Sequence, residues 1–254
     1  MVFAIDIGNT NIVIGCFENE KIVFTERLST KINATVLEYA ISFKNVLELY
    51  DINYKEIEGS IISSVVPEVT TVIYNAIEKI TGKKSKIVGP GLKTGLKIAI
   101  DNPAQLGSDL VVAAVAGILE YPTPLVIVDF GTATTVSVIN KDKEFLGGMI
   151  MPGIMLSMKS LTSNTSLLPT IGLEPPKKFI GTNSVDSMKS GILYSNAFGV
   201  DGLINKIEEV LEEKVNVVAT GGLAKTIAPL CKREIVIDDE LLLKGLMAIY
   251  NRNK

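Results

Sequence analysis

The chain of 254 residues contains no histidine and no tryptophan, and it has only two cysteines. The lack of histidine excludes Ser-His-Asp triads, histidine general bases and every metal site that uses histidine. Cys16 and Cys231 are too few for a disulfide framework or a four-cysteine zinc site. Their apolar surroundings favour buried thiols, and a single disulfide stays open. Acid–base chemistry at neutral pH is left to aspartate, glutamate, lysine, tyrosine or cysteine.

Blocks of one charge and long apolar runs are also missing. The 25 basic and 28 acidic residues give a formal net charge of −3 without a Lys/Arg-rich block, which argues against nucleic-acid binding. No run of about 18 apolar residues predicts a membrane span. The first residues lack the basic start and the cleavage site of a signal peptide, so we expect a cytoplasmic protein. The apolar content of 47% suffices for a sizeable core.

The order of predicted elements is nearly the same in two halves of the chain. Periodicity and turn residues predict strands over 2–7, 11–17, 21–28, 59–65 and 84–88, with helices over 36–50 and 68–80. They then predict strands over 125–129, 135–139, 144–150 and 215–219, with helices over 201–211 and 241–250. We therefore expect an α/β fold of two similar βββαβα halves, residues 1–121 and 122–254, that face each other across a central cleft.

A short acidic turn follows the first strand of each half. The first turn is Asp6-Ile7-Gly8-Asn9-Thr10-Asn11, and the second is Asp129-Phe130-Gly131-Thr132-Ala133-Thr134-Thr135. A carboxylate at a strand end suits Mg²⁺, often through water, and turn amides suit phosphate oxygens. Either turn alone is compatible with an ordinary Asx hairpin turn. Because a nucleoside triphosphate needs donors from two sides, the repetition favours nucleotide binding.

Two further motifs have both a structural and a functional interpretation. Thr220-Gly221-Gly222 allows close backbone approach to a ring or a phosphate, or is a plain strand-to-helix turn. Leu106-Gly107-Ser108-Asp109-Leu110 opens an apolar helix. Ser108 or Asp109 is a candidate N-cap of that helix, and Asp109 is also a candidate base for a substrate hydroxyl beside a transferring phosphate.

These motifs together resemble type III pantothenate kinases. The resemblance spans essentially the whole chain, and its most specific elements are the turn that starts at Asp6 and the DFGTATT stretch that starts at Asp129. Gly107-Ser108-Asp109, the segment from Gly147-Gly148 to Pro152-Gly153, and Thr220-Gly221-Gly222 follow the order and spacing of the family. The resemblance implies duplicated ribonuclease H-like halves, as in actin-like ATPases and in the superfamily of acetate kinase, sugar kinases, Hsp70 and actin.

The same resemblance implies the activity and its cofactors. Members of the family phosphorylate the terminal hydroxyl of pantothenate with ATP to give 4'-phosphopantothenate, the first step of coenzyme A biosynthesis. They use Mg²⁺ and a monovalent cation, K⁺ or NH₄⁺. They are homodimers whose substrate pocket lies near the dimer interface. We accordingly expect pantothenate, ATP and a second copy of the chain as partners, with no nucleic acid and no membrane.

Roles for single residues follow from the resemblance and the motifs. Asp109 is the predicted proton acceptor, Asp6 the predicted Mg²⁺ ligand and Asp129 the predicted ligand of the monovalent cation. The predicted ATP-binding residues are Asp6, Ile7, Gly8, Asn9, Thr10, Asn11, Ile12, Val13, Thr132, Gly221 and Gly222. The predicted substrate-binding residues are Ile100, Gly107, Ser108, Asp109, Leu110 and Ser184.

Two positions depart from the family pattern. Leu110 stands where the family usually has arginine, and Ile100 stands where a tyrosine commonly precedes the Asn-Pro pair. If that arginine grips the substrate, its loss removes a charged hydrogen bond of about 1.5–3 kcal/mol. One alternative is a nucleotide-binding accessory or regulatory protein of the same fold with an impaired acceptor site. A kinase of another small hydroxylated acid or sugar and, more distantly, a polyphosphate phosphatase are further alternatives.

Overall fold

The computed structural model describes residues 1–254, which form two compact units. Unit 1 comprises Met1–Leu96, Asp101–Leu119 and Glu240–Lys254, and unit 2 comprises Lys97–Ile100 and Glu120–Asp239. The predicted division between residues 121 and 122 lies close to the change of unit after Leu119. It differs in two respects: the C-terminal helix, expected in the second half, belongs to unit 1, and the segment Lys97–Ile100, expected in the first half, belongs to unit 2.

The sheet of unit 1 has the strand order β3-β2-β1-β4-β5. Its strands are β1 (Val2–Ile7), β2 (Asn11–Glu18), β3 (Lys21–Ser29), β4 (Gly59–Ser64) and β5 (Lys86–Ile87). β1 pairs antiparallel with β2 and parallel with β4. In the β2–β3 turn, Asn19 (φ 47°) and Glu20 (φ 67°) both have positive φ. Two-residue hairpin turns with this geometry match the twist of the strands that they join. The strand predictions for this part of the chain are confirmed to within a few residues.

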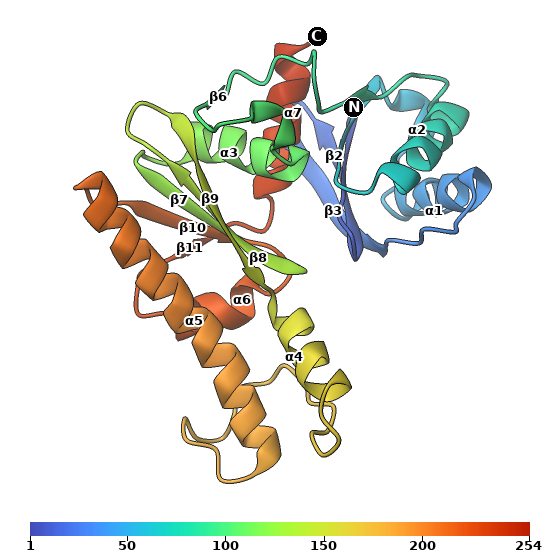
Figure 1. The fold of residues 1–254 in the computed structure, drawn as a ribbon. Coiled ribbons are helices and arrows are strands. Elements are labelled where there is room, and N and C mark those ends of the chain that lie inside the picture. Colours follow the sequence, from blue (N-terminus) through green and yellow to red (C-terminus); the bar gives the residue numbers. More distant parts are fainter. The chain divides into compact units, whose positions relative to one another are not determined.

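Helices cover both faces of this sheet (Figure 1). α1 (Val36–Leu49) and α2 (Pro67–Thr81) bury the apolar side chains of one face, Phe3, Ile5 and Ile7 among them. α1 begins at a complete capping box, in which Thr35 and Glu38 accept each other's backbone N–H groups. α3 (Ser108–Glu120) and α7 (Leu241–Arg252) approach each other closely, since a Cβ on Gly245 would touch the backbone carbonyl of Val112.

The position of α7 in unit 1 has a steric explanation. α7 packs on β1, β2 and β4. Two glycines of this sheet make room for it: a Cβ on Gly15 would touch Leu243, and one on Gly59 would touch the Tyr250 ring. The apolar face of α7 is therefore complementary to the first sheet, although its sequence follows the second half.

The sheet of unit 2 has the strand order β11-β10-β7-β8-β9-β6. Its strands are β6 (Lys97–Ile98), β7 (Leu125–Phe130), β8 (Ala133–Ile139), β9 (Glu144–Pro152), β10 (Asn216–Thr220) and β11 (Val236–Ile237). The order β9-β8-β7-β10-β11 repeats β3-β2-β1-β4-β5 of unit 1, so the predicted duplication is confirmed. β9 extends two residues beyond the predicted strand over 144–150, because it pairs with β8 as far as Pro152.

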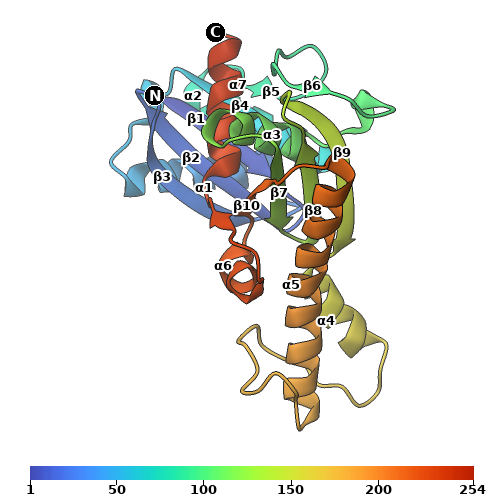
Figure 2. The same cartoon turned by 90° about the vertical axis from the view of Figure 1, so that its left-hand side faces the viewer.

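The helices of unit 2 are α4 (Ile154–Ser163), α5 (Ser184–Leu211) and the short α6 (Ala224–Ile227). Figure 2 shows the first part of α5 beside α4, which it contacts. The predicted helix over 201–211 is only the second part of α5. The helix starts much earlier, where the Asn183 side chain accepts the backbone N–H of Asp186 at 2.9 Å. None of the helices is long and apolar enough to cross a lipid bilayer.

Candidate active site

The first acidic turn is held firmly to its own sheet. Asp6 lies at the carboxyl end of β1 and is only 8% exposed. The backbone N–H of Gly8 donates to the Asn11 carbonyl at 3.0 Å, and the Thr30 hydroxyl donates to the Gly8 carbonyl at 2.6 Å. Asn9 between them is exposed. The turn thus presents polar groups to solvent on a fixed backbone next to a buried carboxylate, as a phosphate-binding turn requires.

Asp109 lies in the first turn of α3, in the same unit. Its carboxylate accepts the backbone N–H of Leu110 at 2.8 Å. Burial raises the pKa of the Asp109 carboxyl, and the backbone N–H groups of Leu110 and of Asp109 itself oppose that rise. A partly desolvated carboxylate at a helix start is well suited to accept a proton from a bound hydroxyl.

The hydroxyl of Ser108 does not cap the helix that it begins. The carbonyl of Gly107 accepts the first helical hydrogen bond, from Val111 N–H at 3.1 Å, so Gly107 occupies the N-cap position. Ser108 Oγ instead bonds to the end of β4, where it accepts Ser64 N–H at 3.0 Å and donates to the Ser64 carbonyl at 2.9 Å. The capping interpretation of Ser108 is therefore wrong, because its hydroxyl joins the helix to the sheet.

The second acidic turn is assembled in unit 2. Asp129 on β7 lies opposite Thr220 on β10 in the parallel register. Gly221 has φ of +94°, and a Cβ there would meet Asp129 Oδ1 and the Phe130 backbone. The chain after β10 therefore passes directly beside the Asp129 carboxylate, which only glycine permits.

Thr132 lies at the exposed tip of the same turn. The turn is backed by Gly153, where a Cβ would touch the carbonyl oxygens of Gly131 and Thr132. Gly153 is also the N-cap of α4. The start of α4 and the turn are thus in backbone contact, which fixes the path of the chain around Thr132.

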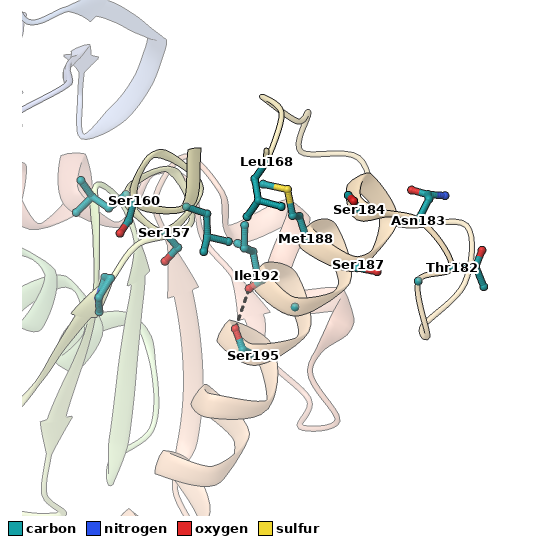
Figure 3. A pocket seen from close by; sticks show the side chains of 15 residues that line it. Ser157, Ser160, Leu168, Thr182, Asn183, Ser184, Ser187, Met188, Ile192 and Ser195 are labelled. Carbon is teal, nitrogen blue, oxygen red and sulfur yellow. Dashed lines mark hydrogen bonds between the residues drawn. The ribbon is translucent and has the colours of Figure 1, made fainter. Parts of the chain in front are cut away.

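Ser184 lies with a different set of residues, in a pocket between α4 and α5 (Figure 3). The pocket has a volume of about 1170 Å³. Serine side chains from both helices line it, together with apolar ones such as Leu168 and Met188. A pocket with hydroxyl groups on apolar walls suits a small polar organic molecule.

Oxygen ligands for hard cations are present in both units, but neither unit forms a complete cage. No group of three or more aspartate, glutamate or cysteine side chains is arranged to hold a metal ion. A Mg²⁺ ion bound with a nucleotide takes one or two carboxylates and completes its shell with phosphates and water. Beside Asp129, the hydroxyl of Thr220 is buried without a hydrogen-bond partner in the chain. A carboxylate next to an unsatisfied hydroxyl fits a monovalent cation.

The predicted site residues divide between the units. Unit 1 contains residues 6–13 and 107–110, and unit 2 contains Ile100, Asp129, Thr132, Ser184 and the Gly221-Gly222 pair. Sequence reasoning missed Ser63 and Ser64 of β4, which contact Ser108. Their signal in the sequence is only a pair of serines at the end of an apolar strand.

Two solved structures define the fold class of the chain. The activator of 2-hydroxyisocaproyl-CoA dehydratase from Clostridium difficile, with bound ADPNP, matches with a TM-score of 0.59 at 14% identity and covers 98% of this chain and 93% of that one. The ROK hexokinase from Thermus thermophilus matches with a TM-score of 0.54 at 12% identity and covers 100% and 99%. The duplicated fold is therefore that of the actin-like ATPases and sugar kinases.

Similarity in sequence narrows this class to one family. A family model described as type III pantothenate kinase matches residues 2–206. The type III pantothenate kinases of Bacillus cytotoxicus and Halalkalibacterium halodurans are each 43% identical over 253 residues. These alignments cover 100% of this chain, and 97% and 100% of the two relatives respectively. The chain belongs to the type III pantothenate kinase family and is a kinase.

Proposed function

We propose that the protein transfers the γ-phosphoryl group of ATP to the primary hydroxyl of pantothenate, with Asp109 as the proton acceptor. The observation that carries the proposal is the position of Asp109, a half-buried carboxylate with a raised pKa in the same unit as the turn at Asp6. The family to which the chain belongs supports the choice of pantothenate as acceptor and gives the reaction its place at the entry to coenzyme A synthesis.

Phosphoryl transfer has a loose transition state, so positioning and charge neutralisation contribute most of the catalysis. In this proposal Thr10, Asn11 and Thr132 donate hydrogen bonds to phosphate oxygens, and Gly221 and Gly222 let the backbone approach the nucleotide. Asp109 orients the acceptor hydroxyl and takes its proton late, when the bond to phosphorus is forming. Asp109 must be ionised to do this, and its raised pKa in the free protein places the acid limb of kcat/KM above the ordinary range of an aspartate.

Two aspartates would hold the cations. Asp6 would hold Mg²⁺, directly or through water, and Asp129 would hold K⁺ or NH₄⁺ with the neighbouring Thr220 hydroxyl available as a further oxygen ligand. The cations supply positive charge that offsets the charge of the triphosphate. Because ATP is a metabolite of the cytoplasm, the proposal places the protein there.

The Asp109→Asn variant tests the catalytic assignment. It keeps the size of the side chain and removes its basicity, so we expect ATP binding to be retained and turnover to fall by at least ~100-fold. ADP release is measured with Mg·ATP and KCl, with and without pantothenate, and ATP binding is measured by calorimetry. Asp142→Asn, at an exposed loop position, is the matched control.

The same assay separates the alternatives left by Leu110 and Ile100. ADP release that depends on pantothenate supports the proposal. Release only with another hydroxylated acid or sugar from an acceptor panel would replace pantothenate as the substrate. ATP binding without ADP release in the wild type would contradict the catalytic proposal altogether, and near-normal turnover of Asp109→Asn would remove Asp109 from its role.

The proposal includes a homodimer. We define the α4–α5 arm as residues 154–200. Many apolar side chains on it are exposed, among them Leu167 at 91% and Ile180 at 77%. The other exposed apolar residues of the arm are Met155, Leu156, Leu161, Phe179, Val185 and Phe198. Soluble monomers rarely expose so much apolar surface in one region, which supports a second copy of the chain as its partner.

Sedimentation velocity tests the dimer. We expect the wild-type chain to sediment as a dimer at micromolar concentration and a Leu167→Asp, Ile180→Asp double variant to sediment as a monomer. Ile32→Asp, which places the same charge at a 63% exposed position in unit 1, should leave the dimer intact. A monomeric wild type would contradict this part of the proposal without affecting the assignment of Asp109.

A further inference from the structure

The hydroxyl of Ser108 has no capacity left for a ligand. A serine hydroxyl has one donor and two acceptor positions. Ser108 Oγ donates to the Ser64 carbonyl at 2.9 Å, and it accepts Ser64 N–H at 3.0 Å and the Ser63 hydroxyl at 3.1 Å. Any contact of Ser108 with a substrate must therefore use its backbone, and the side chain serves another purpose.

The partner of Ser108 is the strand neighbour of Asp6. Ser63 on β4 is opposite Asp6 on β1 in the parallel register, so the two side chains lie on the same face of the sheet. Ser63 is fully buried at 0% exposure. Its hydroxyl therefore connects the position beside the Asp6 carboxylate to the residue immediately before Asp109.

The β4 end of this connection is itself rigid. The Thr70 hydroxyl of α2 donates to Ser64 Oγ at 2.6 Å, and Ser64 Oγ accepts the backbone N–H of Val66 at 3.1 Å. The backbone N–H of Val65 donates to the Ile7 carbonyl at 3.1 Å, which extends the β1–β4 pairing to the start of the Asp6 turn. The start of α3 is thus bonded to a point that the sheet and α2 both hold in place.

We infer that the Ser63–Ser108 hydroxyl pair is a positioning element that fixes Asp109 relative to Asp6. The inference rests on the proposed role of Asp109. Phosphoryl transfer requires the acceptor hydroxyl and the phosphate in line, and a misplacement of about 1 Å can lower a rate about 100-fold. The hydroxyl pair acts through Asp109 and touches no substrate, so its loss should change kcat more than KM.

The experiment compares Ser108→Ala, Ser63→Ala and the double variant. We expect each single variant to lower kcat by about 10–100-fold while the KM values for ATP and pantothenate change by less than about threefold. Because the two hydroxyls act as one unit, the kcat of the double variant should lie within about threefold of the kcat of the slower single variant. If Ser108→Ala does not fold, Ser63→Ala still tests the pair, since it leaves the two bonds between Ser108 and Ser64 intact.

Ser60→Ala is the matched control. Ser60 is on the same strand, is 1% exposed, and shares a hydroxyl–hydroxyl bond of 2.7 Å with Ser85. It lies on the opposite face of the sheet from Ser63, because the two residues are three positions apart on the strand and side chains alternate between the faces. Ser60→Ala should lower thermal stability about as much as Ser63→Ala and leave kcat unchanged.

Three results would overturn the inference: a kcat within about threefold of wild type in Ser108→Ala, a rise in the KM for pantothenate at unchanged kcat, or an equal loss of kcat in Ser60→Ala. Each of these counts against positioning only if Asp109→Asn is inactive. A fully active Asp109→Asn variant would instead contradict the proposed function, so the two failures are distinguishable.

Discussion

The Gly221→Ala substitution tests how closely the chain passes Asp129. A methyl group at this position would lie 2.7 Å and 2.8 Å from the backbone carbonyl carbon and nitrogen of Phe130, and it would collide with Asp129 Oδ1. The backbone atoms cannot move without disturbing the β7–β10 pairing. The φ of +94° is in addition strained for any residue with a Cβ.

The magnitude follows from these two effects. Overpacking typically destabilises by about 1–3 kcal/mol, and an unfavourable positive φ adds about 1–2 kcal/mol. We therefore expect the free energy of unfolding to fall by about 2–5 kcal/mol in Gly221→Ala. Each kcal/mol corresponds to about 2–4 °C in Tm for a chain of this size, so the Tm should fall by about 4–20 °C.

Thermal unfolding followed by circular dichroism measures this effect, with and without KCl at matched ionic strength. Because the added methyl displaces the Asp129 carboxylate, any rise in Tm produced by K⁺ in the wild type should be lost in Gly221→Ala. The control is Gly202→Ala in α5, where a Cβ would meet nothing within 4 Å and helix propensity predicts a gain of about 0.5–1 kcal/mol. A Gly221→Ala variant that melts at the wild-type Tm and keeps the K⁺ response would refute the reasoning.

Two further predictions concern unit 2 and the thiols. The Arg233 guanidinium lowers the pKa of Glu208 to about 2. The contact between Glu208 and Arg233 therefore stabilises the fold above pH 4.5, the ordinary pKa of a glutamate, and this stabilisation is lost as the pH falls towards 2. Glu208→Gln should lower the free energy of unfolding, measured by denaturant titration, at pH 7 and have little effect on it near pH 2. Burial raises the pKa of Cys16 to about 11 and that of Cys231 to about 12, so a thiol reagent at pH 8 should modify the unfolded chain rapidly and the native protein slowly. Rapid modification of both native thiols would contradict this.

The strands and hairpins could be predicted from sequence because local rules specify them. The acidic turns at Asp6 and Asp129, the Asn19-Glu20 hairpin and the apolar periodicity of α1 each depend on neighbouring residues. The parallel and antiparallel pairings then follow from the repeated order of elements. The matching strand orders place Asp6 and Asp129 at equivalent positions in the two sheets, at the ends of β1 and β7. Their positions could therefore be predicted without long-range information.

The first half of α5 could not be predicted in the same way. Residues 184–200 contain several serines and glycines, which have low helix propensity, and the helix depends on packing of residues such as Ile192 and Ala197 into the core of unit 2. The usable signal was at its start, where Asn183 precedes Asp186 by three residues in the manner of a helix N-terminus. α7 posed a different difficulty, because its periodicity predicts a helix but cannot say which of two similar sheets it covers.

The departures from the family pattern at Leu110 and Ile100 concern which acceptor is used, and they do not affect the assignment of the chain to the family. Identity of 43% over the whole chain reflects the fold and the many residues that build it, whereas in the proposed site two side chains bear only on how an acceptor is held. Leu110 follows Asp109 on α3, and its backbone N–H still donates to the Asp109 carboxylate at 2.8 Å. A leucine provides this backbone donor as well as an arginine would. This backbone contact of Asp109 is therefore independent of the side chain at 110, so a change of acceptor preference at this position would leave the proposed proton acceptor and the turn at Asp6 in place.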